Sequence, residues 1–501
     1  MSRGERRELT PNEGRESPMP RSILPTPRQP APCRRRRLAA LLGLLAAVGV
    51  RGVHAQGSVE EASAPVAVET DTLAGPATDS AGTRLHWGGA LFDWSFANVF
   101  PWAYNRFASG QDWARVSLDS WSQNLQRLPS WDDNSFYANH LAHAYHGAMY
   151  HNAGRANGFS FLASVPFTVA GSAVWEYFGE TNVPSLNDMM TTTAGGIVLG
   201  EVTFRASQLV LDDGARGLDR LFREVAVFAM NPGLGVHRLS RGKSWKVTRG
   251  AAPTRAPHDV SFDVGYREVA QRGAGTGGLQ QAVVRAGLRH GDPFAQEKLT
   301  PFDVFEMSVE FGSNQPRTLM SVSGAGILTG ARLSPGMVLG ATMEYGFVSN
   351  SVYEFSAGAF GLALRGRTHA SGRWRAGAEL GVLASPVAAV PTDYSSALIE
   401  RPYDITAGVG ARATAYVDRG PVRARASYTA YHFVPLSAAA TDHQVQLASA
   451  EARIPVVGPF SIGAGYDVFI QSSRFGQDLG RVTRQYPEVR LFVSRSGGDW
   501  R

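Results

Sequence analysis

Residues 403–418 read YDITAGVGARATAYVD, and along this stretch apolar side chains alternate with smaller or more polar ones. One face carries Tyr, Ile, Ala and Val, and the other carries mainly Asp, Thr, Gly and Arg. A period of two predicts a β-strand, and this one is much longer than the roughly 5 to 6 residues of an average strand. Strands that cross a bilayer obliquely need about 9 to 11 residues. The stretch therefore indicates one strand of an outer-membrane-type β-barrel.

The same alternation recurs between residues 258 and 496, for example in 337–347 and 373–382. The face opposite the apolar one combines glycine with charged residues, which suits a narrow, wet barrel lumen. We count about twelve candidate strands, an even number that is typical of bacterial barrels. A soluble β-sandwich or a lipocalin-like barrel is the alternative interpretation. The aromatic residues expected to form girdles at the membrane interfaces are Tyr345, Phe347, Tyr428, Tyr466 and Tyr486.

The N-terminal region has the pattern of an export signal. Residues 34–55, RRRRLAALLGLLAAVGVRGVHA, give a basic patch, a short apolar run and a small-x-small ending. We interpret residues 1–55 as a signal peptide, and the sequence leaves open whether translation starts at Met1 or Met19. Residues 56–88 are rich in Ala, Pro, Thr and acids, and they predict a flexible linker.

Charge and cysteine content both change once this leader is set aside. The formal net charge of the chain is +6, but residues 1–55 hold eleven Arg against four Glu, which is +7, so the remainder is close to −1. The high isoelectric point therefore does not indicate nucleic-acid binding. The single cysteine, Cys33, also lies in the leader, so the mature chain should hold no disulfide.

Residues 89–250 change to helical periods interrupted by Gly, Pro and Asn, and residues 256–501 form the predicted barrel. The fold class is thus α+β, with an N-terminal helical module before an antiparallel barrel. Two segments of the module are unusually apolar and should pack as a buried hairpin. The expected helices lie near residues 112–126, 135–153, 160–179, 186–211 and 216–230.

The module also concentrates side chains that carry chemistry. In the segment NHLAHAYHGAMYHNAGRANG, His143 and His146 lie one helical turn apart and share a face. We take these histidines as candidate ligands of a divalent metal, with Glu176 and Asp188 as candidate catalytic or ligating carboxylates. The spacing HxxH is a weaker signal than HExxH, because no base adjoins it. The other members of the polar cluster are His140, Tyr150, Arg155 and Glu180.

Each of these residues also has an ordinary structural interpretation. Asp188 follows Ser185 by three residues and could complete a capping box. His143 and His146 could form a buried polar network with Glu176 instead of a metal site. Glu201 and Arg205, which are four residues apart, are expected to form an ion pair on a helix surface.

The segments HAYHGAMYHNAGRANGFSF, GSAVWEYFGE, PSLNDMMTTTAGGIVLGE, ASQLVLDDG and FREVAVFAMNPGLGVHRL follow one another in fixed order. They resemble an uncharacterised bacterial family, the domain of unknown function numbered 3943, over about residues 90 to 245. The resemblance implies an exported envelope protein with a helical domain and a β-rich tail, and it brings no activity or catalytic residue. A weaker similarity links His143, Glu176, Asp188 and Gly195 to VanZ-like envelope domains.

Two functions remain open from the sequence. The first is a binding or structural protein of the outer membrane, whose barrel contacts lipid and whose module binds lipid, glycan or protein. The second is a metal-assisted hydrolase or transferase that acts on envelope lipid or glycan, with a divalent metal as its cofactor. Because both ends of an even-stranded barrel lie on one side, we expect the module to face the periplasm or to plug the lumen. A passive pore is disfavoured, since a pore needs no helical module.

Overall fold

The computed structural model describes ten stretches of the chain. The predicted signal peptide and almost all of the predicted linker lie outside them. The described residues are 85–248, 258–270, 278–313, 318–350, 352–368, 374–392, 401–419, 422–437, 440–475 and 480–498.

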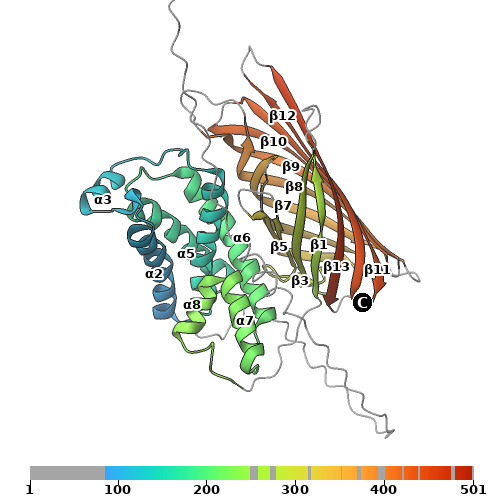
Figure 1. The fold of residues 1–501 in the computed structure, drawn as a ribbon, viewed down its shortest axis with the longest axis horizontal. Coiled ribbons are helices and arrows are strands. Elements are labelled where there is room, and N and C mark those ends of the chain that lie inside the picture. The colour runs from blue at the N-terminus through green and yellow to red at the C-terminus, as the bar shows by residue number, and fades with distance from the viewer. Residues whose placement is uncertain are drawn as a thin grey trace, which may run out of the picture. The chain divides into compact units, whose positions relative to one another are not determined.

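Helices fill the N-terminal part of the described chain (Figure 1). The expected helices 160–179, 186–211 and 216–230 agree closely with α5, α6 and α7, and 112–126 and 135–153 overlap α3 and α4, whereas α2 and α8 were not predicted. The α2 sequence is apolar on nearly every side and shows no clear period, and Asn231-Pro232 resembles a helix stop. Instead, the Asn231 side chain accepts a hydrogen bond from the Leu234 N–H and caps α8, with Pro232 in its first turn. The α-helices are α2 (Trp87–Ala103), α3 (Leu118–Leu125), α4 (His143–Arg155), α5 (Phe161–Val174), α6 (Leu186–Val210), α7 (Gly217–Met230) and α8 (Pro232–Ser240). Among the described helices, none is both long and apolar enough to cross a membrane.

Three short π-helical turns join these helices, and a 3-10 turn, η2 (Asp112–Ala114), precedes α3. A π-helical turn holds an extra residue, so it redirects the side chains on and after it, and such turns are frequent at functional sites. The π-helical turns are η1 (Tyr104–Ala108), η3 (Ala138–Ala142) and η4 (Trp175–Gly179).

The C-terminal part forms a closed antiparallel barrel. β1 pairs with both β2 and β13, and every following strand pairs with its neighbours until the ring is complete. Within the described residues twelve strands close the ring, and the two-residue β3 adds to β5. The predicted fold class is therefore confirmed, and a two-sheet sandwich is excluded. The strands are β1 (His258–Val269), β2 (Leu279–His290), β3 (Lys298–Leu299), β4 (Phe305–Gly312), β5 (Leu319–Ser334), β6 (Met337–Ser349), β7 (Glu354–Arg367), β8 (Trp374–Pro391), β9 (Tyr403–Arg419), β10 (Val422–Ser437), β11 (Asp442–Val457), β12 (Phe460–Arg474) and β13 (Arg481–Gly498).

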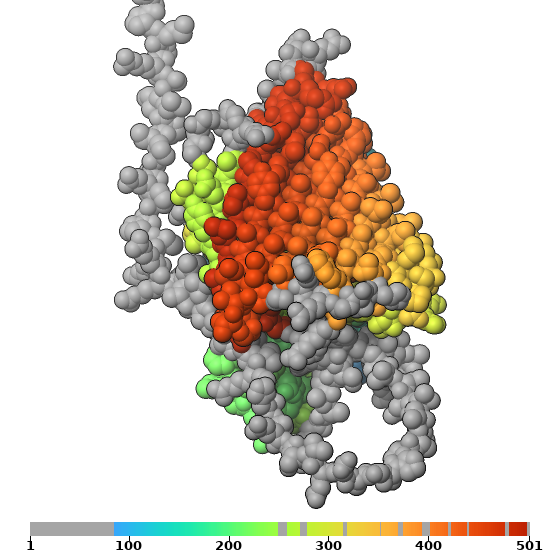
Figure 2. Space-filling model, turned by 90° about the vertical axis from the view of Figure 1, so that its right-hand side faces the viewer, coloured from blue at the N-terminus to red at the C-terminus, as the bar shows by residue number. Residues whose placement is uncertain are grey.

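The two faces of the barrel wall differ as the alternation predicts. Outward side chains such as Leu380, Val382 and Val409 are 63%, 61% and 62% exposed. Lumen side chains form ion pairs, for example Arg412 with Glu344 at 2.5 Å. Figure 2 shows the outer face of the later strands, coloured orange to red, as one continuous surface. An apolar outside and a charged inside are the arrangement expected of a barrel in lipid.

The two rims of the barrel differ in the lengths of their connections. At one rim, β5 and β6 are separated only by residues 335–336, and β11 and β12 only by 458–459. We call this rim the short-turn edge, and β1 begins there. At the opposite rim, the loop edge, residues 392–402 separate β8 from β9.

The helical module packs against the outer wall of the barrel rather than inside it. Glu344 faces the lumen, whereas the next residue, Tyr345, points outward and its hydroxyl donates to the His140 carbonyl oxygen. A Cβ added at Gly324 would lie 3.1 Å from the Val202 side chain of α6, so the glycine at this position of β5 allows α6 to approach the strand closely. The expectation that the module plugs the lumen is therefore wrong.

The same packing corrects the predicted aromatic girdle. Tyr345 and Phe347 are buried under the module, and Tyr486 is buried in a cluster of aromatic side chains inside the lumen. Only Tyr428 and Tyr466, which are 45% and 52% exposed, lie outward on the open wall. Alternation alone cannot distinguish an outward residue that meets lipid from one that meets a helix.

Candidate functional site

Three of the four main candidate residues converge in the module. His143 begins α4, Glu176 lies in the π-helical turn η4, and Asp188 lies in the first turn of α6. One ligand atom from each lies within 4.8 Å of the other two, and only His143 keeps some exposure. Bonds of about 2.0–2.2 Å to a shared zinc ion would require only small side-chain movements from this arrangement. We call these three residues the His–Glu–Asp group.

The His143 ring is oriented by a neighbour on α6. Its Nδ1 lies 3.2 Å from the Thr192 hydroxyl oxygen, and its Nε2 lies 3.6 Å from the nearer carboxylate oxygen of Asp188. The hydrogen bond at Nδ1 orients the ring, so that Nε2 faces Asp188 and is available as a ligand or base. Burial lowers the pKa of His143 to about 4, so the ring is neutral near pH 7, as a metal ligand must be.

The Asp188 carboxylate is not used for capping in the expected way. The Ser185 hydroxyl accepts from the Asp188 N–H at 3.2 Å, which is one half of a capping box. The reciprocal half comes from Glu176, whose carboxylate accepts from the Ser185 N–H at 2.8 Å. Asp188 is therefore free to face His143, and the start of α6 holds Glu176 in place.

The two carboxyl groups are buried without a compensating cation. Within the part of the chain that the structure describes, neither Glu176 nor Asp188 forms an ion pair with lysine or arginine. Burial raises the pKa of both well above the usual range, and the negative charges of Glu180 on Glu176 and of Asp132 on Asp188 raise it further. Such a group either holds protons near neutral pH or binds a cation.

Four of the remaining candidates lie close to the group without joining it. His146 shares a face with His143, but its Nε2–H donates to the Ala97 carbonyl oxygen at 2.8 Å. Tyr150 donates to the Asn98 side chain at 2.9 Å. Glu180 accepts from the indole N–H of Trp175 at 2.7 Å, and His140 packs between Phe136 and Tyr403 at the barrel wall.

Arg155 belongs to a separate network around Glu201, which is fully buried. The Nε atoms of Arg155 and Arg205 lie 2.8 and 2.7 Å from Glu201 oxygens, and His151 Nε2 lies 3.2 Å away. The ion pair of Glu201 with Arg205 was predicted, but it lies in the interior and not on a helix surface. Arg205 also lies 3.5 Å from Asp303, so two arginines face two carboxylates, and we assign this network to stability.

Sequence reasoning missed three polar residues beside the His–Glu–Asp group, namely Asp132, Asn139 and Asn187. The Asn187 side chain donates to Asp132 at 2.6 Å and to Asp188 at 3.1 Å. Asn139 donates both to Asp132 at 2.7 Å and to the Tyr403 hydroxyl at 2.8 Å, which links the group to strand β9. Asp132 lies in the run WDDN before a helix and has no characteristic spacing to the other site residues, so no sequence pattern pointed to it.

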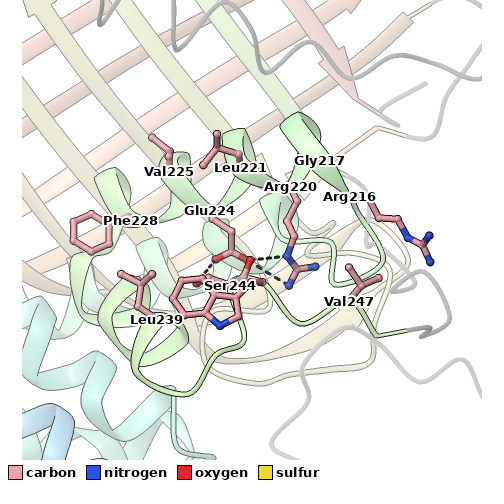
Figure 3. Close-up of a pocket in the computed structure, with 12 residues that line it drawn as sticks. Arg216, Gly217, Arg220, Leu221, Glu224, Val225, Phe228, Leu239, Ser244 and Val247 are labelled. Carbon is pink, nitrogen blue, oxygen red and sulfur yellow. Dashed lines mark hydrogen bonds and ion pairs between the residues drawn. The ribbon is translucent and has the colours of Figure 1, made fainter.

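A second feature of the module is an apolar pocket of about 690 Å³ between α7, α8 and the segment after α8 (Figure 3). Arg220 organises that segment, because its guanidinium donates to the backbone carbonyls of Ser244 at 2.6 Å and Lys246 at 2.9 Å. Glu224 accepts from the Ser244 hydroxyl at 3.0 Å, and Arg216 lies at one end of the pocket. The apolar lining consists of Leu221, Val225, Phe228, Leu239, Trp245 and Val247.

Comparison with solved structures finds bacterial barrels. The NanC porin is 13% identical over 47% of this chain and 98% of its own, with a TM-score of 0.28. The β domain of the Bordetella autotransporter BrkA is 10% identical over 48% and 100%, with a TM-score of 0.25. The channel DcaP of Acinetobacter baumannii is 11% identical over 48% and 96%, with a TM-score of 0.26. These scores are too low to transfer a function.

No curated protein matches the chain. The family model of the domain of unknown function DUF3943 matches residues 128–233, as the resemblance predicted. This range holds all three residues of the His–Glu–Asp group, so the group lies within the part of the helical module that matches the DUF3943 family model.

Proposed function

We propose that this is an outer-membrane protein whose barrel anchors the helical module, and that the module binds the acyl chains of an envelope lipid. The observation that carries the proposal is the α7–α8 pocket. Its volume falls within the range of about 300–1,000 Å³ that is usual for small-molecule sites, and its lining is mainly apolar. Several lining side chains are strongly exposed, with Trp245 at 67% and Leu221 at 54%, so the pocket is open to a ligand.

Membrane placement is supported by the outward apolar band of the barrel. Exposing residues such as Leu380, Val382 and Leu491 to water costs about 25 cal/mol for each Å² of apolar surface, whereas lipid removes that cost. Bacterial barrels place their short turns in the periplasm. Near the end of α6, Arg205 donates to the Pro301 carbonyl oxygen at 2.6 Å, in the segment between β2 and β4 at the short-turn edge. Together these features favour a module with its α7–α8 end on the periplasmic side.

The lipid proposal is tested through the one tryptophan in the pocket. Full-length protein is reconstituted with phospholipids whose acyl chains carry bromine, which quenches indole fluorescence on contact. We expect quenching to fall when Trp245 is replaced by Phe, and we expect a Val225→Glu variant to lose co-purified lipid. Replacement of Trp121, which donates to the Phe178 carbonyl oxygen away from the pocket, is the matched control. Equal quenching in the Trp245→Phe protein and the wild type would contradict lipid binding here.

The periplasmic orientation needs a separate measurement. Because the only cysteine lies in the predicted leader, a cysteine introduced at exposed Ser240, the last residue of α8, would be the single target of a thiol reagent. We expect no reaction with a membrane-impermeant maleimide in intact cells, and reaction after the outer membrane is permeabilised. Labelling in intact cells would place the module on the cell surface.

A second function is favoured by the His–Glu–Asp group, namely a metal-assisted hydrolase or transferase that acts on envelope lipid or glycan. One neutral imidazole and two carboxylates resemble the ligand sets of catalytic zinc sites, which keep one position open for water. A bound divalent metal would supply an activated water at neutral pH. His143, Glu176 and Asp188 would hold the ion, and His146 stays a predicted member of the site.

Metal content distinguishes this second function from a purely structural cluster. We expect about one equivalent of zinc or another divalent metal in dialysed wild-type protein, and its loss in a His143→Ala variant. Exposed His86 provides the control, since a His86→Ala variant should keep the metal. Metal-free wild type that takes up no added zinc would leave the group as a polar network.

A further inference from the structure

Two helices of the module, α2 and α5, present an exposed surface without charge. Every strongly exposed side chain on them is apolar except that of Ser95, and the one ionisable residue in either helix, Asp93, is buried. Asp93 is also paired, since His237 and Arg241 nitrogens lie 2.8 and 3.1 Å from its carboxylate oxygens. We call the larger exposed apolar residues the α2–α5 face, and they are Leu91, Phe92, Val99, Phe100, Leu162 and Val169.

A surface without charge is not a general property of this module. α7 exposes Asp219, and α3 exposes Asp119 and Gln123, among their apolar residues. α2 and α5 lie side by side, because the Trp94 indole N–H donates to the Phe167 carbonyl oxygen at 2.9 Å, so their exposed residues form one surface. Monomeric proteins in water rarely expose a large continuous apolar surface, and such a surface usually contacts protein or lipid.

The height of this face relative to the barrel follows from α6, which runs along the outer wall between the two edges. Near the end of α6, Arg205 donates to the Pro301 carbonyl oxygen at the short-turn edge. In its first turn, Asn187 donates to the Asp132 side chain at 2.6 Å. The Asp132 carbonyl oxygen in turn accepts at 3.1 Å from Arg401, which lies at the loop edge between β8 and β9. The helix therefore lies beside the wall over the height of the apolar band.

The helices that carry the face lie at the same height. α5 packs against both α2 and α6 (Figure 1), and at its start the ring centroid of Phe161 lies 5.4 Å from that of Phe302 at the short-turn edge. The 17 residues of α2 span about 26 Å, at about 1.5 Å for each residue, and the apolar band of bacterial barrels is about 25 Å tall. Trp87 at one end of α2 and Tyr104 just after the other are both 59% exposed. Tryptophan and tyrosine are enriched at the two interfaces of a membrane, and α2 has one at each end.

We propose that the α2–α5 face contacts the hydrocarbon of the outer membrane, so that this part of the helical module lies beside the barrel within the bilayer. The proposal rests on the membrane placement of the barrel given above and does not depend on the α7–α8 pocket. Lipid is the occupant that the wall itself favours, because the open strands expose equally apolar residues, such as Val382 and Val409, at the same height. A helix satisfies its own backbone hydrogen bonds, so α2 and α5 can meet lipid on one side while the barrel anchors them.

The test uses full-length protein in phospholipid vesicles, with a nitroxide label on a cysteine introduced at Val99 of α2 or at Val169 of α5. Val409 on the open wall is the lipid control, and exposed Ser334 at the short-turn edge is the water control. Dissolved oxygen concentrates in hydrocarbon, whereas a charged nickel chelate stays in water, and each shortens the relaxation time of a nitroxide that it reaches. We expect labels at Val99 and Val169 to respond to oxygen and to lose the response to nickel, as at Val409, whereas the label at Ser334 responds to nickel.

The controls separate failure of this proposal from failure of the membrane placement. A nickel response at Val99 and Val169, with Val409 still shielded from nickel, would overturn lipid contact by the α2–α5 face and leave the barrel in the membrane. A nickel response at Val409 as well would overturn both. Labels that neither reagent reaches would show that a second copy or another protein covers the face, which also contradicts lipid contact. Folding of each labelled variant is checked by the faster electrophoretic migration of unheated folded barrels.

Discussion

Two substitutions on α6 that each turn a carboxylate into an amide should change stability in opposite directions. Asp188→Asn removes a buried carboxyl that has no cationic partner, and Asn can still accept the hydrogen bond that Asn187 donates at 3.1 Å. Glu201→Gln removes the acid that Arg155 and Arg205 both contact, so each of these two buried guanidinium groups loses an ion pair. Both sites are buried to a similar degree, so the local balance of charge decides whether each substitution raises or lowers the free energy of unfolding.

The magnitudes follow from the local contacts. A buried polar group without a compensating partner costs about 1–3 kcal/mol, so Asp188→Asn should stabilise the metal-free protein by about that amount near pH 8. Breaking a buried ion pair from one side typically costs about 3–5 kcal/mol, which is the expected loss for Glu201→Gln.

Urea unfolding of the full-length protein in detergent with a chelator measures both changes. Eight of the ten tryptophans lie between residues 87 and 245, so indole fluorescence reports on the helical module. Added zinc should stabilise the wild type, by about 2.7 kcal/mol at one hundred times its dissociation constant, and should leave Asp188→Asn unchanged. Destabilisation by Asp188→Asn in the chelated protein would refute the claim that this carboxyl is uncompensated.

Three further predictions rest on single features. The raised pKa of Asp188 implies that, through this group, chelated protein is most stable below the ordinary aspartate pKa of about 4 and loses stability as pH rises above it. The lowered pKa of His143 has the opposite effect on the free energy of unfolding: the stability due to this group is present above about pH 6.5 and is lost as pH falls toward 4. Unfolding midpoints measured over a pH series show both effects. Gly147→Ala should destabilise the module by about 2–4 kcal/mol, because the new Cβ would lie 1.9 Å from a backbone oxygen of α6. Gly88→Ala is the control, because a Cβ at Gly88 would meet open space and should not destabilise the module. Urea unfolding measures both changes. Glu344→Gln should lower the temperature at which the folded barrel loses its fast electrophoretic migration, because Arg412 keeps its charge in the lumen without a partner.

The barrel was predictable because its signal is local. Alternation along one strand, with glycine and charge on the second face, already separates lumen from exterior. Whether an outward residue contacts lipid or another part of the protein depends on segments that are distant in the sequence. Phe347 and Val409 have the same pattern in the sequence, yet one is buried under a helix and the other is 62% exposed.

The candidate site shows the same division. The residue types at His143, Glu176 and Asp188 indicated their chemistry, and three packed helices bring them together. His146 has equally suitable chemistry, but the next turn of α4 aims its Nε2 at a carbonyl of α2, a helix that the sequence pattern did not reveal.

Because α6 contacts only part of the outer wall, one side of the barrel is covered by the helical module and the other side is open. Gly324 and Gly358 leave room for the side chains of Val202 and Ala194 against the wall. The outer faces of the strands from β4 to β9 therefore pack against the helical module, whereas the outer faces of the remaining strands are open. A neighbouring protein in the same membrane can then approach only from the open side, and rotation about the barrel axis no longer yields equivalent faces. Assembly of the barrel and docking of the module must also be coordinated, because a wall inserted without its helices would present the polar Tyr345 hydroxyl to hydrocarbon.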